Sequence, residues 1–135
     1  MIIGYTTGVF DMFHIGHLNI LRRAKEQCDF LIVGVTSDEL CFARKKHYPI
    51  INEKERMAIV EAIRYVDKVV PQNDMDKFLA VKKFKVNKVF VGSDWKGTDS
   101  WKKYEEEFAK VGCSVTYLEH TDGISSSMLR TKIGK

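Results

Sequence analysis

Residues 2–36 read IIGYTTGVFDMFHIGHLNILRRAKEQCDFLIVGVT, a segment in which the spacing of apolar residues changes twice. The β-branched run Ile2–Thr6 predicts a strand. Apolar residues then recur at steps of three and four, the spacing of one helix face; they are Leu18, Leu21, Ala24 and Cys28. The nearly continuous apolar run Phe30–Thr36 is typical of a strand buried on both faces. The segment therefore predicts a strand–helix–strand unit.

The same alternation continues along the rest of the chain. Asn52, with Glu55 three residues later, predicts a helix N-cap, and the helix after it would place Met57, Val60 and Ile63 inward. The remaining predicted elements are, in order, a strand Val66–Val70 stopped by Pro71, a helix around Phe78, Leu79 and Lys82, a strand Lys88–Gly92, a helix with Trp101, Tyr104 and Phe108 that ends near Gly112, a strand Ser114–Leu118 and a helix Ser125–Ile133. Strict strand–helix alternation predicts an α/β fold, a five-stranded parallel sheet with helices on both faces.

Length and composition narrow the class of protein. The 135 residues, 15.6 kDa, have the size of one domain, so residues 1–135 are expected to form a single unit. A net charge of +4 permits an anionic ligand but falls short of the basic stripe of a nucleic-acid-binding protein, so no nucleic-acid partner is expected. No apolar run approaches the ~18 residues of a membrane span, and no signal peptide is visible, so we expect a cytoplasmic protein. The three cysteines form no C-x-x-C pair and indicate neither a disulfide framework nor a zinc knuckle.

Residues suited to chemistry gather after the predicted strands. In parallel sheets, ligands bind beyond the carboxyl ends of the strands, where the strand order reverses. Gly8 opens the turn after the first strand, and the helix start that follows offers unpaired N–H groups to an anion. His14 and His17 lie three residues apart, so both rings would point the same way on a first helical turn. Two such imidazoles could donate hydrogen bonds to a phosphate, could cap the helix, or could form a metal pair, for which no third ligand of suitable spacing stands nearby.

Three later segments have similar positions. The basic run RKK at 44–46 is expected in a loop, either as a solvated face or folded over a polyphosphate. Residues 92–97 read GSDWKG and have the glycine spacing of a P-loop, but Thr98 stands where the lysine is required, so that motif is absent. Trp95 is either a core residue or the lining of a base pocket. Residues 120–127 read HTDGISSS, and serines at a helix start either cap the helix or hold a phosphate.

Together, these motifs resemble the H-x-G-H nucleotidyltransferase superfamily, and within it the cytidylyltransferase branch, most closely the glycerol-3-phosphate cytidylyltransferases. The matching stretches are GVFD at 8–11, HIGH at 14–17, RYVD at 64–67, GSDW at 92–95 and GISSS at 123–127. Because the likeness runs from Ile3 to about Ile133, it covers nearly the whole chain. Several ordered motifs at the right spacing are far more specific than any one of them.

The resemblance implies a Rossmann-like fold and an enzyme, a nucleotidyltransferase that moves CMP from CTP to a small phosphomonoester such as glycerol 3-phosphate and releases pyrophosphate. It also implies Mg²⁺ bound with the CTP, and a homodimer. It assigns catalytic roles near the phosphates to His14, His17, Arg44, Lys46, Ser125 and Ser126. It assigns the nucleotide site to Gly8, Val9, Phe10, Asp11, Arg64, Asp67, Gly92, Asp94, Trp95, His120, Thr121, Gly123 and Ile124.

Three residues depart from the family pattern. Val9 stands where the family has a threonine, Arg44 replaces a lysine, and His120 replaces an arginine. An unperturbed imidazole is mostly neutral at pH 7, so His120 would weaken phosphate binding or make it pH-dependent. Two other interpretations stay open. One is an adenylyltransferase that uses ATP on a sugar phosphate or FMN, and the other is a nucleotide-binding module without catalysis.

Overall fold

The computed structural model describes residues 1–74 and 76–119. These residues form a parallel sheet of five strands: β1 (Ile3–Gly8), β2 (Phe30–Thr36), β3 (Lys68–Gln72), β4 (Lys88–Gly92) and β5 (Ser114–Leu118). The strand order is β3-β2-β1-β4-β5, so β1 lies at the centre. The chain builds one half of the sheet outward from β1 and then crosses to the other half at β4. The strand order therefore reverses between β1 and β4.

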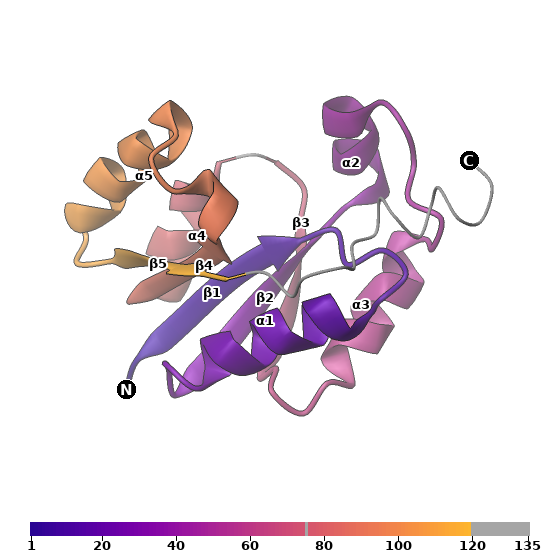
Figure 1. The fold of residues 1–135 in the computed structure, drawn as a ribbon, viewed down its shortest axis with the longest axis horizontal. Helices are drawn as coiled ribbons and strands as arrows, with labels where there is room; N and C mark the ends of the chain where they lie inside the picture. The colour runs from indigo at the N-terminus through magenta and orange to yellow at the C-terminus, as the bar shows by residue number, and fades with distance from the viewer. Residues whose placement is uncertain (75, 120–135) are drawn as a thin grey trace.

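Helices cover the two faces of this sheet, as predicted. On one face lie α1 (Ile15–Lys25) and α3 (Glu53–Glu61), and on the other lie α4 (Lys77–Phe84) and α5 (Asp99–Ala109) (Figure 1). The short helix α2 (Asp38–Lys45) stands beyond the carboxyl end of β2 (Figure 1). A single 3₁₀ turn, η1 (Ser93–Trp95), follows β4 among the described residues. No helix in this part of the chain combines the length and apolar character needed to cross a membrane.

Each face of the sheet has its own core, which explains the continuous apolar run of β2. Val33 and Val35 pack toward α1 and α3, in a cluster with Leu21 and Val60. Ile32, which directly precedes Val33, packs toward α4 and α5 in the second cluster. Because successive side chains of a strand point to opposite faces, a central strand covered on both sides needs an apolar residue at every position.

The edge strand β3 differs from its prediction. The sequence predicted that Pro71 would stop a strand Val66–Val70, but the strand runs from Lys68 to Gln72 and contains the proline, paired in register with Val35. Among the described strands, β3 is at the edge of the sheet. A proline that lacks an N–H group is tolerated there because one side of the strand makes no ladder bonds.

The basic run 44–46 was wrongly predicted to be a loop. It ends α2: Arg44 lies in the last turn, and Lys46 is the C-cap, with a left-handed φ of 64°. Two helices, α2 and α3, therefore follow β2, and the alternation is not strict. In this eight-residue helix only Cys41 is buried, so the apolar period that reveals a helix in sequence is nearly absent. The predicted helix Ser125–Ile133 lies outside the described residues.

Candidate functional site

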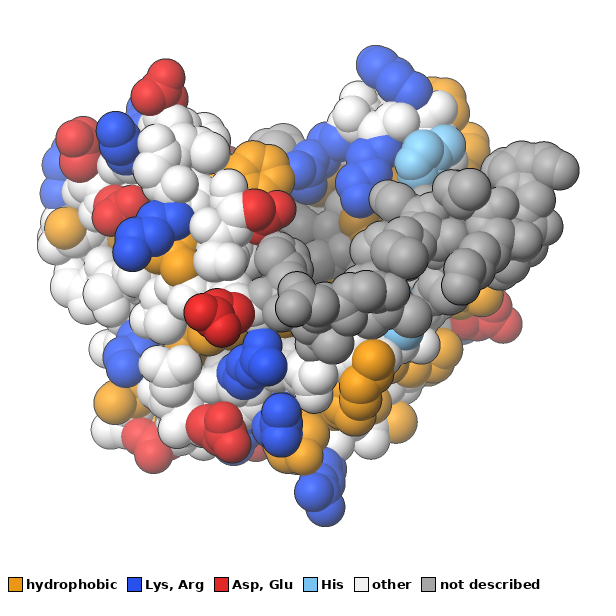
Figure 2. Space-filling model, in the orientation of Figure 1, with side chains coloured by type: hydrophobic (Ala, Val, Ile, Leu, Met, Phe, Trp, Pro, Cys, Tyr) orange, Lys and Arg blue, Asp and Glu red, His pale blue; other side chains and the backbone are white. Residues whose placement is uncertain are grey.

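A cleft of about 330 Å³ lies beyond the carboxyl ends of β1 and β4. This is the predicted place, where the strand order reverses. Its wall includes Thr7–Val9 at the end of β1, Arg44 and Lys45 from α2, Trp95 from η1, and Trp101 and Tyr104 from α5. In Figure 2 the molecule is hollowed between α2 and α5, and Lys and Arg side chains gather on the α2 side of the hollow. Lys77 of the described chain also lines the cleft, which therefore combines three positive charges with aromatic surface, a lining suited to an anionic ligand that carries a ring.

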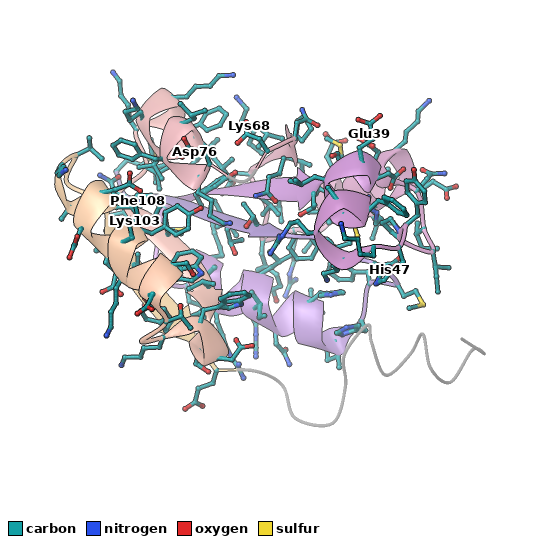
Figure 3. The ribbon with its side chains drawn as sticks, turned by 90° about the horizontal axis from the view of Figure 1, so that it is seen from above. Glu39, His47, Lys68, Asp76, Lys103 and Phe108 are labelled. Carbon is teal, nitrogen blue, oxygen red and sulfur yellow. The ribbon has the colours of Figure 1, made fainter. Side chains whose placement is uncertain are left out.

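The elements that flank the cleft come from different parts of the chain, α2 on one side and α4 and α5 on the other. Seen from above, Asp76 at the start of α4 lies on the same side of the molecule as Lys103 and Phe108 of α5, and Glu39 and His47 lie across from them, on and just after α2 (Figure 3). The carboxyl ends of β1 and β4 lie between these two sides.

His14 and His17 cap the start of α1 together. The Gly16 N–H donates to His14 Nδ1 over 3.0 Å, and the His14 N–H donates to His17 Nδ1 over 3.3 Å. The two rings stack, with centroids 3.8 Å apart and an interplanar angle of 21°. Since each Nδ1 atom serves the backbone, each ring presents its Nε2 atom away from the cap. Capping and ligand binding, which the sequence left as alternatives, are therefore compatible on the same rings.

Both imidazoles are neutral near pH 7. Burial lowers the pKa of His14, and burial together with the charge of His14 lowers the pKa of His17 to about 4. A neutral ring whose Nδ1 accepts a hydrogen bond carries its proton on Nε2. His14 Nε2 is buried and has no hydrogen-bond partner among the described residues. The pair thus supplies N–H donors at a helix start, an arrangement suited to binding phosphate oxygens.

The loop between β1 and α1 has an unusual backbone that brings the histidines into place. Phe10 and Met12 have φ angles of 55° and 50°, in the left-handed region that non-glycine residues seldom adopt. The Phe10 ring packs edge-on against the His17 ring, with centroids 5.3 Å apart. A Cβ atom on Gly8 would lie 2.9 Å from that phenyl ring, so only glycine leaves room for it.

Two buried charged residues hold this loop. Asp11 is 1% exposed, and its carboxylate oxygens accept hydrogen bonds from the N–H groups of Ile50 and Ile51, each over 2.9 Å. The guanidinium group of Arg56, also 1% exposed, donates to the carbonyl oxygens of Val9, Thr36 and Ile51 and pairs with Asp38 over 2.7 Å. Arg56 therefore ties together the ends of β1 and β2, the start of α2 and the loop before α3.

Arg56 and Lys77 were both missed by the sequence analysis. Arg56 had a signal: it lies four residues before Val60, so the inward face predicted for α3 contained an arginine. An arginine on a buried face needs several acceptors, which indicates a structural junction. Lys77 had no such signal, because it reads as an ordinary lysine at the start of a helix. The structure gives it a place in the cleft.

Of the predicted site residues that the structure describes, Gly8, Val9, Arg44 and Trp95 line the cleft, and most of the others lie on the segments that follow β1 and β4. Gly8, Val9, Phe10, Asp11, His14 and His17 form the end of β1, the following loop and the first turn of α1. Arg44 and Trp95 line the cleft, and Gly92 and Asp94 lie at the end of β4 and in η1. Lys46 is exposed at the C-cap of α2.

Arg64 and Asp67 are not brought to this cleft. Asp67 lies just before β3, where its carboxylate accepts from the Leu31 N–H over 2.8 Å and pairs with Lys25 over 2.6 Å. These contacts are at the amino end of the sheet, opposite the cleft. Arg64 is fully exposed and lies over the Tyr65 ring. The predicted residues His120, Thr121, Gly123, Ile124, Ser125 and Ser126 lie outside the described residues.

The described part of the chain contains no group of three or more His, Cys, Asp or Glu side chains that could hold a metal ion. Magnesium in nucleotide sites is usually held by one or two carboxylates together with the phosphates and water. The described lining of the cleft contains no carboxylate, so the side chains there offer such an ion none of these ligands.

Comparison with known proteins gives a consistent result. A model of the cytidylyltransferase-like family matches residues 5–132. The chain is 38% identical, over 130 residues, to a glycerol-3-phosphate cytidylyltransferase of Staphylococcus aureus, covering 95% of this chain and 92% of that protein. It is 36% identical, over 112 residues, to an FAD synthase of Archaeoglobus fulgidus, covering 83% of this chain and 80% of that protein.

One further similarity covers only half of this chain, and another is to a solved structure. An ethanolamine-phosphate cytidylyltransferase of Arabidopsis thaliana is 51% identical over 67 residues, which are 49% of this chain and 16% of that protein. The crystal structure of a lipopolysaccharide core biosynthesis protein from Thermoplasma volcanium has a TM-score of 0.75 and 27% identity, covering 92% of this chain and 99% of that one. The fold and the predicted motifs therefore occur together in known proteins.

Proposed function

The chain belongs to the cytidylyltransferase-like family, and we propose that within it the chain transfers CMP from CTP to glycerol 3-phosphate and releases pyrophosphate. It is a nucleotidyltransferase. The observation that carries the choice of substrates is the similarity of 35–38% to three glycerol-3-phosphate cytidylyltransferases over 93–95% of this chain. The FAD synthase relative supports adenylyl transfer as the second candidate.

The proposed reaction is a displacement at the α-phosphorus of CTP. A phosphate oxygen of the acceptor forms a new bond to that phosphorus, and the bond to the oxygen of the pyrophosphate group breaks on the opposite side. A phosphomonoester near pH 7 already carries negative charge on its oxygens, so no side chain has to remove a proton. Catalysis of this kind depends on positioning and on stabilising charge.

The histidine pair suits this requirement. In the proposal, the Nε2–H groups of His14 and His17 donate to oxygens of the α-phosphate and of the leaving pyrophosphate. Neutral donors with lowered pKa values stay protonated on Nε2 and do not exchange protons with the substrate. Removal of one such donor from a transition state typically costs 10²–10³-fold in kcat. The helix start beneath the rings adds its partial positive charge.

The remaining cleft residues have roles that follow from their charge and position. Arg44, at the end of α2, would neutralise the triphosphate together with the Mg²⁺ that CTP carries. The Trp95 side chain, which is 42% exposed at the cleft, offers an aromatic face to the cytosine ring. Ser125 and Ser126, which lie outside the residues that the structure describes, are proposed to bind phosphate, as the sequence suggested.

The test is to incubate the purified protein with Mg²⁺ and four substrate pairs: CTP or ATP, each with glycerol 3-phosphate or FMN. We expect pyrophosphate release and CDP-glycerol, identified by ³¹P NMR, with CTP and glycerol 3-phosphate. If FAD forms from ATP and FMN while CTP gives no product, adenylyl transfer replaces the proposal. If CTP binds calorimetrically but no phosphomonoester gives pyrophosphate, the protein is a binding module.

We also propose that the protein is a homodimer acting in the cytoplasm. Phe42, Tyr48 and Ile50, on and just after α2, are 42–60% exposed, and the first two stack on each other at 4.6 Å. Exposed apolar side chains grouped in this way favour a protein contact. Light scattering should give twice the chain mass, and Tyr48→Asp should lower it. The three free cysteines suit a reducing compartment.

A further inference from the structure

Lys77 has a surrounding that an ordinary surface lysine lacks. It is the first residue of α4, where it follows the N-cap Asp76. It borders two hollows at once: the cleft beyond β1 and β4, and a second cavity of about 320 Å³ between β3 and α4. Lys77 therefore lies between the cleft and this second cavity.

Two aromatic rings of α5 hold the Lys77 side chain. Lys77 Nζ lies 5.6 Å from the centroid of the Trp101 ring and 5.5 Å from that of the Tyr104 ring, both within the range of a cation–π contact. The two rings are 5.0 Å apart and tilted by 56°, so they form a corner around the ammonium group. An ammonium group on a ligand would bind favourably in the same kind of aromatic corner.

The charges that face Lys77 leave its ammonium group without a carboxylate partner. Arg44 and Lys45 face it from α2 across the cleft, Tyr104 faces it from α5, and Asp74 and Asp76 precede α4 along the second cavity. In the described part of the chain, ion pairs join Lys25 to Asp67 and Arg56 to Asp38, and none involves Lys77. A phosphate placed between Lys77 and Arg44 would therefore meet two cations and relieve their repulsion.

We propose that Lys77 determines the acceptor specificity of the cleft: its ammonium group binds the acceptor's phosphate, fills the aromatic corner of Trp101 and Tyr104, and so excludes acceptors with a positively charged tail. This inference rests on the proposed cytidylyl transfer. It selects among acceptors that differ chemically in the tail, because glycerol 3-phosphate has an uncharged polyol and phosphoethanolamine an ammonium group. The choice is a real one, since this chain resembles proteins named for each acceptor.

The physical reason is that the position suited to a ligand cation is already occupied. A tail ammonium group would lie close to that of Lys77, and like charges a few ångströms apart near a protein surface repel strongly enough to cost about tenfold or more in affinity. An uncharged polyol meets no such repulsion, and the hydroxyl groups of Thr7 and Ser100 in the same cleft can bind its hydroxyl groups.

The test compares kcat/KM for glycerol 3-phosphate and for phosphoethanolamine, with saturating CTP, in the wild type and in Lys77→Met and Lys77→Arg. Lys77→Met should lose about 10–100-fold toward glycerol 3-phosphate, the effect of one charge-assisted hydrogen bond. It should lose much less toward phosphoethanolamine, so the ratio between the acceptors shifts by about tenfold or more. Lys77→Arg keeps the charge and should keep the ratio. Lys82→Met is the matched control, because it removes the same charge from an exposed position of α4.

A pH profile gives a second readout that a purely structural role would not move. Burial and the nearby charge of Arg44 lower the pKa of Lys77 to about 8, whereas burial and Asp76 raise that of Tyr104. The wild-type kcat/KM for glycerol 3-phosphate should therefore fall above about pH 8, since this parameter reports groups of the free enzyme. An arginine does not titrate in this range, so Lys77→Arg should remove the decline.

The outcomes separate this inference from the proposed function. A shifted ratio in Lys77→Met, with an unchanged KM for CTP, supports the inference. Equal losses toward both acceptors, or a loss confined to the KM for CTP, overturn it and leave cytidylyl transfer in place. If the wild type forms no product from CTP with either acceptor, the proposed function fails and the inference with it. If Lys77→Met does not fold, Lys77→Arg decides, because a persisting alkaline decline refutes the assignment.

Discussion

Replacing His14 by asparagine and by alanine separates its two roles in the site. His14 caps α1 by accepting the Gly16 N–H at Nδ1, 3.0 Å away, and presents a proton on Nε2. Asparagine has an acceptor oxygen close to the position of Nδ1 but nothing at the position of Nε2. His14→Asn therefore keeps the cap and loses the donor, whereas His14→Ala loses both. Each variant also loses the stacking on His17, so the difference between them isolates the cap.

The magnitudes follow from the two contacts. Alanine in place of a good N-cap residue costs about 1 kcal/mol, whereas asparagine is among the best caps. For a chain of 135 residues, about 1 kcal/mol corresponds to a Tm difference of about 3–5 °C between the variants. Loss of the Nε2 donor should lower kcat by about 10²-fold or more in both. The two variants are then equally inactive but unequally stable.

Calorimetric Tm values and steady-state pyrophosphate release measure the two effects separately. A His14→Asn variant as unstable as His14→Ala would show that Nδ1 is not the capping atom. A His14→Asn variant that keeps more than about a tenth of the wild-type kcat would refute the donor role of Nε2. Either result would contradict the tautomer assigned from the hydrogen bonds of the pair.

Two further predictions concern the free energy of unfolding. Arg56→Met removes a buried guanidinium that serves three carbonyl oxygens and Asp38, so urea unfolding should show a loss of about 3–5 kcal/mol. The exposed Arg64→Met should change stability by less than about 0.5 kcal/mol, and an Arg56→Met loss equally small would refute the junction. The pKa of His17, lowered by burial to about 4, means that the unfolded chain binds a proton between pH 6.5 and 4 that the folded chain does not. Its contribution should reduce the free energy of unfolding progressively as the pH falls across this window, by on the order of 3 kcal/mol at pH 4, and His17→Asn should flatten this part of the pH dependence.

Most of the sheet could be predicted from sequence because its strands carry a local signal, although the strand predicted at Ile2–Thr6 runs from Ile3 to Gly8 as β1. The predicted bounds of β2, β4 and β5 match the structure, since the apolar runs of β2 and β4 and the alternating polar and apolar residues of β5 are each typical of a strand. The extent of β3 could not be predicted, because whether a proline ends a strand depends on whether that strand lies at an edge, a tertiary property. The helix α2 was missed for a related reason: it stands beyond the sheet and buries one residue, so packing imposes little pattern on its sequence.

The site shows the same division between local and distant causes. The histidine pair could be predicted because its geometry is fixed within a single helical turn. The place of Lys77 could not, because it depends on two rings more than twenty positions further along the chain. For Asp67 the prediction and the structure differ. Its motif suggested a nucleotide contact, but its carboxylate pairs with Lys25 and accepts a hydrogen bond from the Leu31 N–H at the other end of the sheet. A motif identifies a family more securely than it locates each of its residues.

The loop between β1 and α1 shows why a single motif contains both chemical and structural residues. Two left-handed residues, Phe10 and Met12, would each cost on the order of 1–3 kcal/mol in a free chain. They persist because Arg56 holds the Val9 carbonyl before them and Asp11 holds the Ile50 and Ile51 N–H groups beside them. The described hydrogen bonds of the Asp11 carboxylate are to backbone N–H groups. A substitution of Asp11 would therefore affect nucleotide binding indirectly, by moving His14. The identity of a motif residue thus reflects the backbone conformation that the histidines require as much as any contact with a ligand.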